Sequence, residues 1–529
     1  MRKTFILVTL AAVLLSPLSA PVQAQSSQNH KPRLFEFRLG NEVLYSRYHH
    51  LIEGKRVGLI TNQSGVNSQG QSTIDVLASD PAVNLVALYG PEHGIDGTAV
   101  AGAWVESYIH PTLNIPVYSL YGPTRKPTGD MLEGIDVLLY DVQDIGSRTY
   151  TYISTLRCAM EAAKECGKTV IVLDRPNPVG CEIVEAPVLE DYYQTFVGID
   201  NLPMAHGMTV GELARFFNRN IGVNLRVVPM EGYTRDMIYQ DTGLEWVPTS
   251  PNIPDIDSVF GYMATGLGEG TGIRQDDKFK WIGGAGIDSS RFAGMLNGAH
   301  LPGVEFIPEN KGSQGGVRLK ITDYHTFNPA KTGLYALAYA RQLNNFTVPK
   351  SGSDIVMFDK VMGTNRVGQW LEQKLSPQEI ESRYRAELEQ FKRQREQYLI
   401  YGYTDIYAGK PGHVGVVVNN VPLFLDSAPY IDSNNRTMVP VRAISEAIGA
   451  EVDWDPARYQ VTIANGESSV KLVIGNPAIE VNGEKHTMDT VPVIRNNRTM
   501  VPLRYVGEFL GVSIGWDGAN RIATVTQEQ

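Results

Sequence analysis

The stretch NLVALYGPEHGIDG, from Asn84 to Gly97, joins an apolar run to a polar segment rich in glycine. A continuous apolar run is typical of a strand buried on both faces of a parallel sheet. The polar segment begins with Glu92 and His93, and glutamate is not a turn-forming residue. Either this is a polar turn, or the strand delivers a carboxylate and an imidazole to a site.

Three further apolar runs resemble it: RVGLIT (56–61), DVLLYD (136–141) and TVIVLD (169–174). Segments with helical spacing lie between or after these runs, including TYISTLRCAMEAAKECG (151–167) and MTVGELARFFN (208–218). In the second segment, Thr209 and Glu212 have the spacing of a capping box. Apolar strands that alternate with helices predict an α/β fold with a parallel sheet covered on both faces.

The remainder of the chain shows two other patterns. From about residue 201 to 401 it is mixed, with predicted helices at TGLYALAYARQL and SPQEIESRYRAELEQFKRQREQYL. Near the C-terminus, NNRTMVPVRAISEAIGAEVDWD (434–455) recurs as NNRTMVPLRYVGEFLGVSIGWD (496–517), with Pro440 and Pro502 at matching places. Such a duplication predicts two similar units packed as one module.

Composition narrows the class of protein. A chain of 529 residues is too long to fold around a single hydrophobic core, so several domains are expected. A net charge of -10 argues against a nucleic-acid partner. Arg2, Lys3 and the apolar run TFILVTLAAVLL, followed by VQA ending at Ala24, predict a cleaved signal peptide and no transmembrane segment afterwards. Cys158 and Cys166 share a predicted helix about 12 Å apart along its axis, too far for a disulfide. We therefore expect a secreted protein, extracellular or wall-associated, without disulfides.

Every predicted strand of the parallel sheet ends in polar residues. Because ligands of open α/β sheets bind at the carboxyl ends of the strands, these ends predict one polar cleft. The candidates are Asn62 after the first strand, Glu92 and His93 after the second, Asp141, Asp144, Arg148 and Tyr150 after the third, and Asp174, Arg175 and Asn177 after the fourth. Singly, several have ordinary explanations: aspartate and asparagine form turns and caps, and Arg148 could pair with Asp144. His206, before a predicted helix, is equally compatible with a structural and a functional role.

The chemistry open to this set is limited. The chain has no G-x-S-x-G elbow, no H-E-x-x-H spacing, no P-loop and no convincing dinucleotide-binding glycine pattern. We therefore expect neither a metal nor a cofactor. Glycoside cleavage needs a protonated carboxyl near the leaving oxygen, with help from a second carboxylate or from the substrate itself. A glutamate in a semi-enclosed cleft can supply that proton, so Glu92 is the leading candidate.

Six motifs carry a resemblance to a known family: GLITNQSG, LYGPEHG, PVYSLYGPTRKPT, YDVQDIGSRTYTYISTL, LDRPNP and AHGMTVGELA. Together they resemble the NamZ-type exo-β-N-acetylmuramidases, over about residues 56–401. The resemblance implies a Rossmann-like domain packed on a smaller auxiliary α+β domain, with the active site between them. It implies that Glu92 is the catalytic carboxyl. One departure is Gly272 in GEGTGIRQDD, where the family carries asparagine after Glu269, Gly270 and Thr271.

The duplicated segment resembles the copper amine oxidase N-terminal-like module of secreted envelope proteins. Its only histidines, His413 and His486, cannot form a three-histidine copper site. Trp454 and Trp516, at matching positions, are expected in the module core, with a sugar-stacking surface as the alternative. We expect the module to associate with the cell envelope.

We therefore predict a secreted exo-acting glycoside hydrolase that releases N-acetylmuramic acid (MurNAc) from the non-reducing end of peptidoglycan fragments such as MurNAc-GlcNAc, in cell-wall turnover. The alternatives are a non-catalytic wall-sugar-binding protein and a secreted esterase or amidase. The expected segments are a signal peptide (1–24), a Rossmann-like catalytic domain (30–200), an auxiliary domain (201–402), a linker (403–413) and the duplicated module (414–529). The expected catalytic residues are Glu92, Asp141 and Asp144, and the expected substrate-binding residues are Asn62, His93, Arg148, Tyr150, Asp174, Arg175, Asn177, His206 and Glu269.

Overall fold

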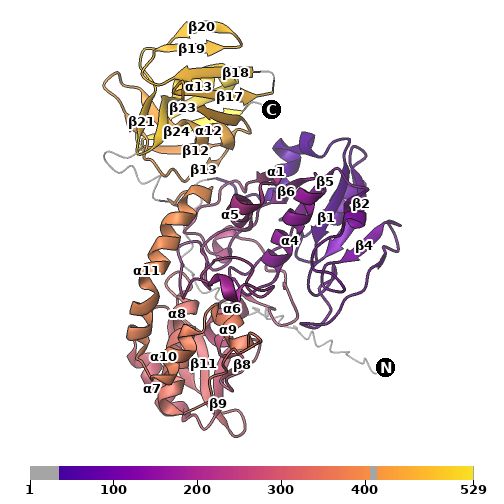
Figure 1. Ribbon diagram of the computed structural model, residues 1–529, viewed down its shortest axis with the longest axis vertical. Helices are drawn as coiled ribbons and strands as arrows, with labels where there is room; N and C mark the ends of the chain where they lie inside the picture. Colours follow the sequence, from indigo (N-terminus) through magenta and orange to yellow (C-terminus); the bar gives the residue numbers. More distant parts are fainter. Residues whose placement is uncertain (1–34, 405–413, 467, 528–529) are drawn as a thin grey trace, which may run out of the picture. The chain divides into compact units, whose positions relative to one another are not determined.

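The structure is a computed structural model that describes residues 35–404, 414–466 and 468–527 (Figure 1). The expected signal peptide over 1–24 and most of the expected linker over 403–413 lie outside the described residues. Across the described ranges, no helix is both long and apolar enough to cross a membrane.

A seven-stranded sheet, in the order β3-β4-β2-β1-β5-β6-β7, forms the first part of the fold (Figure 1). All of its strand pairs are parallel except β3 with β4. The strands are β1 (Arg56–Thr61), β2 (Asn84–Gly90), β3 (Tyr108–Ile109), β4 (Pro116–Ser119), β5 (Val137–Asp141), β6 (Thr169–Leu173) and β7 (Asn224–Val228). The predicted parallel α/β sheet is confirmed, and the four predicted strands are β1, β2, β5 and β6.

Successive residues of each strand bury themselves on opposite faces of this sheet, as the two-residue period of a strand requires. In β5, Leu138 and Tyr140 lie in the apolar core that includes helices α4 (Tyr152–Glu165) and α5 (Val210–Ile221). Val137 and Leu139 lie in a separate core with residues of helices α1 (Gly40–Arg47) and α2 (Thr73–Ser79). Burial on both faces explains why these strands read as continuous apolar runs.

Local sequence signals account for the helix ends. At the start of α5, the Thr209 side chain accepts the backbone N–H of Glu212, and the Glu212 side chain accepts that of Thr209, which is the predicted capping box. The helix ends at Gly222, which has a φ of 64° that glycine adopts at little cost. All three cysteines are free, so the expectation of no disulfide is confirmed.

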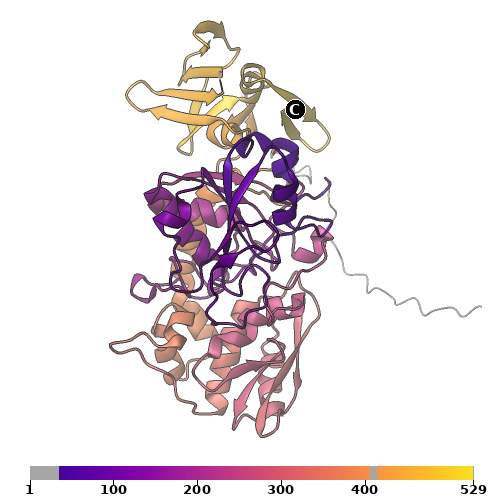
Figure 2. The same ribbon diagram turned by 90° about the vertical axis from the view of Figure 1, so that its right-hand side faces the viewer.

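A second sheet, in the order β10-β11-β9-β8, is antiparallel and packs with helices between residues 256 and 395, coloured pink to orange in Figure 2. Its strands are β8 (Arg274–Asp276), β9 (Trp281–Ala285), β10 (Val304–Pro308) and β11 (Gln314–Ile321). The helices are α6 (Ile256–Thr265), α7 (Ser289–Gly298), α8 (Pro329–Leu343), α9 (Met357–Met362), α10 (Arg366–Glu372) and α11 (Pro377–Arg395). Strand β7 is the last strand of the first sheet, and helix α5 packs against that sheet. The first sheet therefore extends past the boundary expected at residue 200.

The C-terminal region contains the two repeats. Each repeat places a proline at the end of a strand, then a helix, then a second strand: β15 (Thr437–Pro440), α12 (Val441–Ala447) and β16 (Glu451–Asp455); β22 (Arg498–Pro502), α13 (Leu503–Leu510) and β23 (Val512–Asp517). Strands β15 and β22 pair antiparallel, with Met438 opposite Pro502 and Pro440 opposite Met500. Equivalent residues exchange partners in this register, so the repeats meet about a local two-fold axis.

The matched tryptophans of the repeats have different surroundings. Trp454 is partly buried and packs against the module core. Trp516 is 47% exposed, so the expectation that both occupy the core is wrong for Trp516. It lies on β23, two residues after Ile514, which is 38% exposed, and side chains two apart on a strand share a face.

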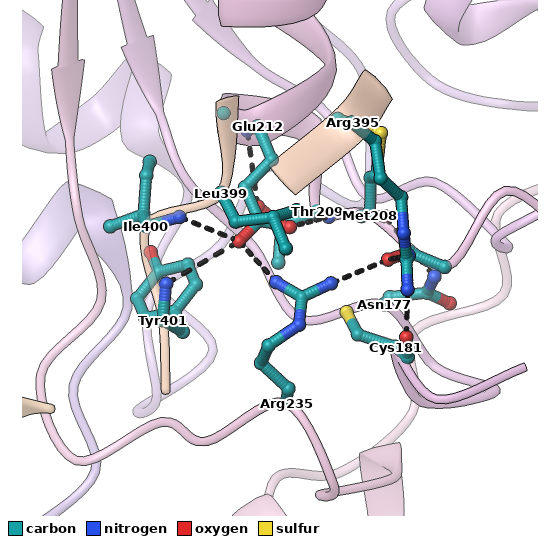
Figure 3. Close-up of polar contacts among 12 residues, drawn as sticks. Asn177, Cys181, Met208, Thr209, Glu212, Arg235, Arg395, Leu399, Ile400 and Tyr401 are labelled. Carbon is teal, nitrogen blue, oxygen red and sulfur yellow. Dashed lines mark hydrogen bonds and ion pairs between the residues drawn. The ribbon is translucent and has the colours of Figure 1, made fainter. Parts of the chain in front are cut away.

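Glu212 and Arg235 form an ion pair in the interior, with Oε1 2.5 Å from Nη1 and neither side chain exposed (Figure 3). The same carboxylate accepts the backbone N–H groups of Thr209 and Ile400. Arg235 also donates to the carbonyl of Gly207 at 2.6 Å. The pair therefore joins the start of α5 to two loops that are distant in sequence.

We predict that Glu212→Gln lowers the free energy of unfolding by about 3–5 kcal/mol, because it leaves the Arg235 charge buried without a counter-ion. Denaturation by guanidinium chloride measures the change. Lys392→Ala is the control: it removes one partner of the partly exposed pair with Glu389 and should change the free energy by less than about 1 kcal/mol. Equal losses in the two variants would contradict the prediction.

Candidate active site at the carboxyl edge of the sheet

Glu92 lies in the loop directly after β2 and is half-buried. Its Oε2 accepts the hydroxyl of Thr151 at 2.5 Å, and its Oε1 accepts the backbone N–H of Gly102 at 2.9 Å. Within the described part of the chain, no arginine or lysine forms an ion pair with this carboxylate. Both donors are neutral, so the described part of the chain does not commit the Glu92 carboxylate to a cation.

His93 shapes the loop that carries Glu92. Its φ is 73°, in the left-handed region that few non-glycine residues adopt. The ring is buried, with Nδ1 2.6 Å from the carbonyl oxygen of Ala99 and the ring edge-on to Tyr152. A carbonyl partner requires Nδ1 to donate. The His93 ring therefore connects the start of the loop, next to Glu92, to Ala99 on its far side.

Tyr262, on α6, lies near carboxylates from the loops after the parallel strands and from the turn after α6. Burial is the main cause that raises the pKa of its hydroxyl to about 12, and the carboxylates of Glu92, Asp144 and Glu269 add to the rise. The hydroxyl accepts that of Thr149 at 3.3 Å. Glu269 is exposed, in the turn after α6. The antiparallel part of the fold therefore contributes a wall to the site that begins at the edge of the parallel sheet.

The turn after Glu269 explains the departure from the family pattern. Gly270 and Gly272 have φ values of 82° and 85°, where side-chain-bearing residues are strained. Asparagine is among the few such residues that adopt positive φ. An asparagine at 272 is therefore compatible with this backbone conformation, and glycine differs from it by lacking the amide side chain.

Asp141 and Arg175 form a second buried ion pair, with Nε 2.5 Å from Oδ1 and Nη2 3.0 Å from Oδ2. Oδ2 also accepts the hydroxyl of Thr73 at 2.6 Å, and Arg175 donates to the carbonyl of Val66 at 2.8 Å. A catalytic role for Asp141 and substrate binding by Arg175 remain predictions, but both Asp141 oxygens and the Nε and Nη2 of Arg175 are already engaged by each other and by the scaffold. This pair connects the ends of β5 and β6.

Arg148 is fully buried and does not pair with Asp144. Its Nη2 donates to the carbonyl of Val361 at 2.7 Å and its Nη1 to that of Lys360 at 3.4 Å, both in α9. Burial lowers the pKa of its guanidinium to about 9. The negative end of the helix dipole stabilises this cation, which links the loop after β5 to α9.

Four more of the predicted residues contact neighbouring loops. Asn177 donates to the carbonyl of Met208 at 3.1 Å, and Tyr150 donates to the hydroxyl of Thr249 at 2.8 Å. His206 is buried, with Nε2 3.7 Å from Oδ2 of Asp144. Within the described residues, the buried atoms of this edge that lack a protein hydrogen-bond partner include Asn62 Nδ2, Gln143 Oε1, Asp144 Oδ1 and His206 Nε2. Buried polar atoms of this kind are where water or ligand is expected.

Asp174 holds the start of α5 against β6. Its carboxylate accepts the hydroxyls of Tyr401 and Thr209 at 2.6 and 2.8 Å, and the backbone N–H of Gly211 at 2.7 Å. Burial raises the pKa of this carboxyl to about 7, although these three hydrogen bonds lower it. Asp174 is fully buried, so its geometry is that of a structural contact.

Three contributors to the site were not singled out from the sequence. Thr151 and Gly102 bond Glu92, and Tyr121 follows β4, which the sequence did not reveal as a strand. Among the described residues, no group of three or more histidine, cysteine, aspartate or glutamate side chains is arranged to hold a metal ion.

Comparison with known families assigns most of the chain. Residues 57–257 match the family model described as exo-beta-N-acetylmuramidase NamZ, N-terminal, and residues 260–401 match its C-terminal counterpart. Residues 417–525 match the copper amine oxidase N-terminal domain. The two NamZ matches meet near the start of α6, which follows the first sheet in the chain.

Known proteins agree with these matches. The chain is 41% identical over 418 residues to the peptidoglycan beta-N-acetylmuramidase NamZ of Bacillus subtilis, covering 76% of this chain and 100% of the relative. Crystal structures of two DUF1343 family proteins from Bacteroides fragilis are similar in fold. One has a TM-score of 0.63 at 38% identity and the other 0.54 at 25%, each covering 70% of this chain and 100% of the solved chain.

We predict that Asp174→Asn changes how stability depends on pH. A folded-state pKa of about 7, above the ordinary 3.8, means that the folded protein holds a proton that the unfolded chain releases. The stability contributed by this proton is fully present below about pH 4 and is lost as the pH rises through about 7. The variant cannot titrate here, so its Tm relative to the unmodified protein should rise between about pH 5 and pH 8.

Thermal melts across this range test the prediction. Asp96→Asn, at an exposed aspartate near Glu92, is the control and should give a Tm difference that does not vary with pH. A constant difference for Asp174→Asn would contradict titration of this group.

Proposed function

This chain belongs to the NamZ family of exo-β-N-acetylmuramidases, and we propose that it releases MurNAc from the non-reducing end of peptidoglycan fragments. Membership makes it a glycoside hydrolase. The observation that supports the reaction best is the position of Glu92, half-buried after β2 and bonded only to neutral donors. A binding protein that used Glu92 structurally would pair it with Arg148 or Arg175, and those cations have other partners.

In the proposed mechanism, Glu92 is the general acid that protonates the leaving glycosidic oxygen. Bond cleavage in such reactions passes through an oxocarbenium-like transition state that a second group stabilises or attacks. Asp144 suits that role better than Asp141, because one Asp144 oxygen has no protein partner whereas Arg175 occupies both oxygens of Asp141. The 2-acetamido group of the sugar is the alternative second group.

We predict that Glu92→Gln lowers kcat on a chromogenic β-MurNAc glycoside by about 10²–10⁴-fold, because the amide keeps the shape of the side chain but cannot donate the proton. The reaction is followed by release of the chromophore and by free MurNAc. Circular dichroism should be unchanged.

A nearby glutamate provides the control. Glu106 is exposed, follows the loop residue Gly102, and should tolerate glutamine with full activity. Retention of more than about a third of the rate by Glu92→Gln on a poor leaving group would remove Glu92 from the mechanism.

We further propose that the enzyme is secreted, acts in wall turnover and recycling, and associates with the envelope through its C-terminal module. The N-terminal sequence, with Arg2 and Lys3 before an apolar run, favours secretion. Trp516 and Ile514 form an exposed apolar strip on β23. An exposed tryptophan offers a flat apolar face on which a sugar ring can stack.

We predict that Trp516→Ala reduces the fraction of protein that sediments with insoluble peptidoglycan, while activity on soluble MurNAc-GlcNAc stays unchanged. Trp516 is 47% exposed, so its removal should cost little stability. Tyr459→Ala, which removes another exposed aromatic residue of the module, is the comparison. Unchanged sedimentation of the Trp516 variant would contradict wall binding by this strip.

A further inference from the structure

Arg125 follows β4, beside the loop that carries Glu92. Strands β4 and β2 are parallel neighbours, with Ser119 opposite Gly90, so the segments after them leave the sheet side by side. The loop after Glu92 spans both: Gly102 N–H donates to Glu92, and Val105 N–H donates to the carbonyl of Tyr121 at 3.1 Å. The turn that ends in Arg125 is thereby held against the catalytic loop.

Two aromatic rings hold the guanidinium of Arg125. Its Cζ lies 3.9 Å from the ring centroid of Tyr121 and 4.4 Å from that of Phe196. The rings are 6.0 Å apart and inclined at 58°, so they form a corner. Contact with ring faces leaves the in-plane N–H donors of a guanidinium available for an anion.

The charge of Arg125 has no acidic partner within the described ranges of the chain, and its side chain is exposed. The neighbouring Lys126 differs, because its Nζ lies 2.6 Å from a carboxylate oxygen of Glu165. Arg175 pairs with Asp141 and is only 3% exposed, and Arg148 is fully buried. Among the arginines at the strand ends, Arg125 is therefore the one whose donors an exogenous carboxylate can reach.

Tyr121 places this cation close to Glu92 but not in contact with it. Burial raises the pKa of the Tyr121 hydroxyl, the Arg125 guanidinium lowers it, and the Glu92 carboxylate raises it, so both charged groups are its neighbours. One tyrosine side chain thus separates the general acid from the cation. In MurNAc the lactyl group is carried on the oxygen of C3 and the scissile bond is at C1, so one sugar presents both the anion and the leaving oxygen.

We propose that Arg125, held in the Tyr121–Phe196 corner, binds the lactyl carboxylate of MurNAc and selects it over GlcNAc. The proposal rests on the proposed function for its substrate. A guanidinium binds a carboxylate with two parallel hydrogen bonds, which a lysine cannot reproduce. A site built for this pairing discriminates against sugars that lack the anion.

The test compares Arg125→Ala and Arg125→Lys on 4-nitrophenyl glycosides of β-MurNAc, of its lactyl methyl ester and of β-GlcNAc. We expect Arg125→Ala to lower kcat/KM on the charged sugar by about 10- to 100-fold, mainly through KM, with little change on the ester or on β-GlcNAc. Arg125→Lys should lose less. Lys126→Ala is the matched control and should behave as the unmodified enzyme, since Lys126 pairs with Glu165.

A binding measurement separates this proposal from the proposed function. Titration calorimetry of MurNAc-GlcNAc and of its lactyl ester into Glu92→Gln, with and without Arg125→Ala, reports recognition without turnover. If the unmodified protein cleaves no muramyl substrate but binding still depends on Arg125 and on the lactyl charge, the proposed function fails and this proposal stands. Equal losses on the charged and esterified sugars, or unchanged selectivity in Arg125→Ala, would overturn the role of Arg125.

Discussion

The ion pair between Glu212 and Arg235 is completely buried (Figure 3). It supplies hydrogen-bond partners to backbone groups of loops that have no regular structure of their own. Arg395, at the end of α11, donates to the carbonyls of His206 and Gly207 beside it, so a third buried charge belongs to the cluster. Burial lowers the pKa of the Arg395 guanidinium to about 10, with the nearby Arg235 charge as a further cause. The hydrogen bonds of this cluster restrict the conformations of the joined segments, and among the described residues only Nε of Arg235 and Nε of Arg395 in these two guanidinium groups are buried without a protein partner.

The acidic residues at the carboxyl edge of the parallel sheet differ in the groups that they contact. The Asp141 carboxylate meets a guanidinium and becomes part of the scaffold. Asp174 meets hydroxyls and a helix N-terminus, where burial keeps its pKa near 7. Glu92 follows β2, which β1 separates from β5; within the described residues its hydrogen-bond donors Thr151 and Gly102 are neutral, and its side chain is half-buried. The same sheet edge therefore gathers carboxylates with different partners, and the buried cations Arg148 and Arg175 contact groups other than Glu92.

Much of this organisation was predictable from the sequence because it depends on local rules. Continuous apolar runs predicted β1, β2, β5 and β6, and the spacing of Thr209 and Glu212 predicted the start of α5. The repeat predicted two similar units, and their pairing through β15 and β22 follows from that similarity. Strand β4 escaped prediction: it has four residues, and its apolar content is too small for a periodic signal.

Residues close together in the chain were enough to predict the sheet and its polar edge, and they made Glu92 the leading candidate for the acid. Only the tertiary structure decided which cation pairs with which acid. Arg175 meets Asp141, 34 residues away, and Arg148 meets carbonyls of α9, more than 200 residues away. Within the described residues Arg125 has no acidic partner, and the corner that holds it combines Tyr121 with Phe196, which is distant in the sequence. Charges act through space over a few ångströms, so their partners are set by packing and not by spacing along the chain.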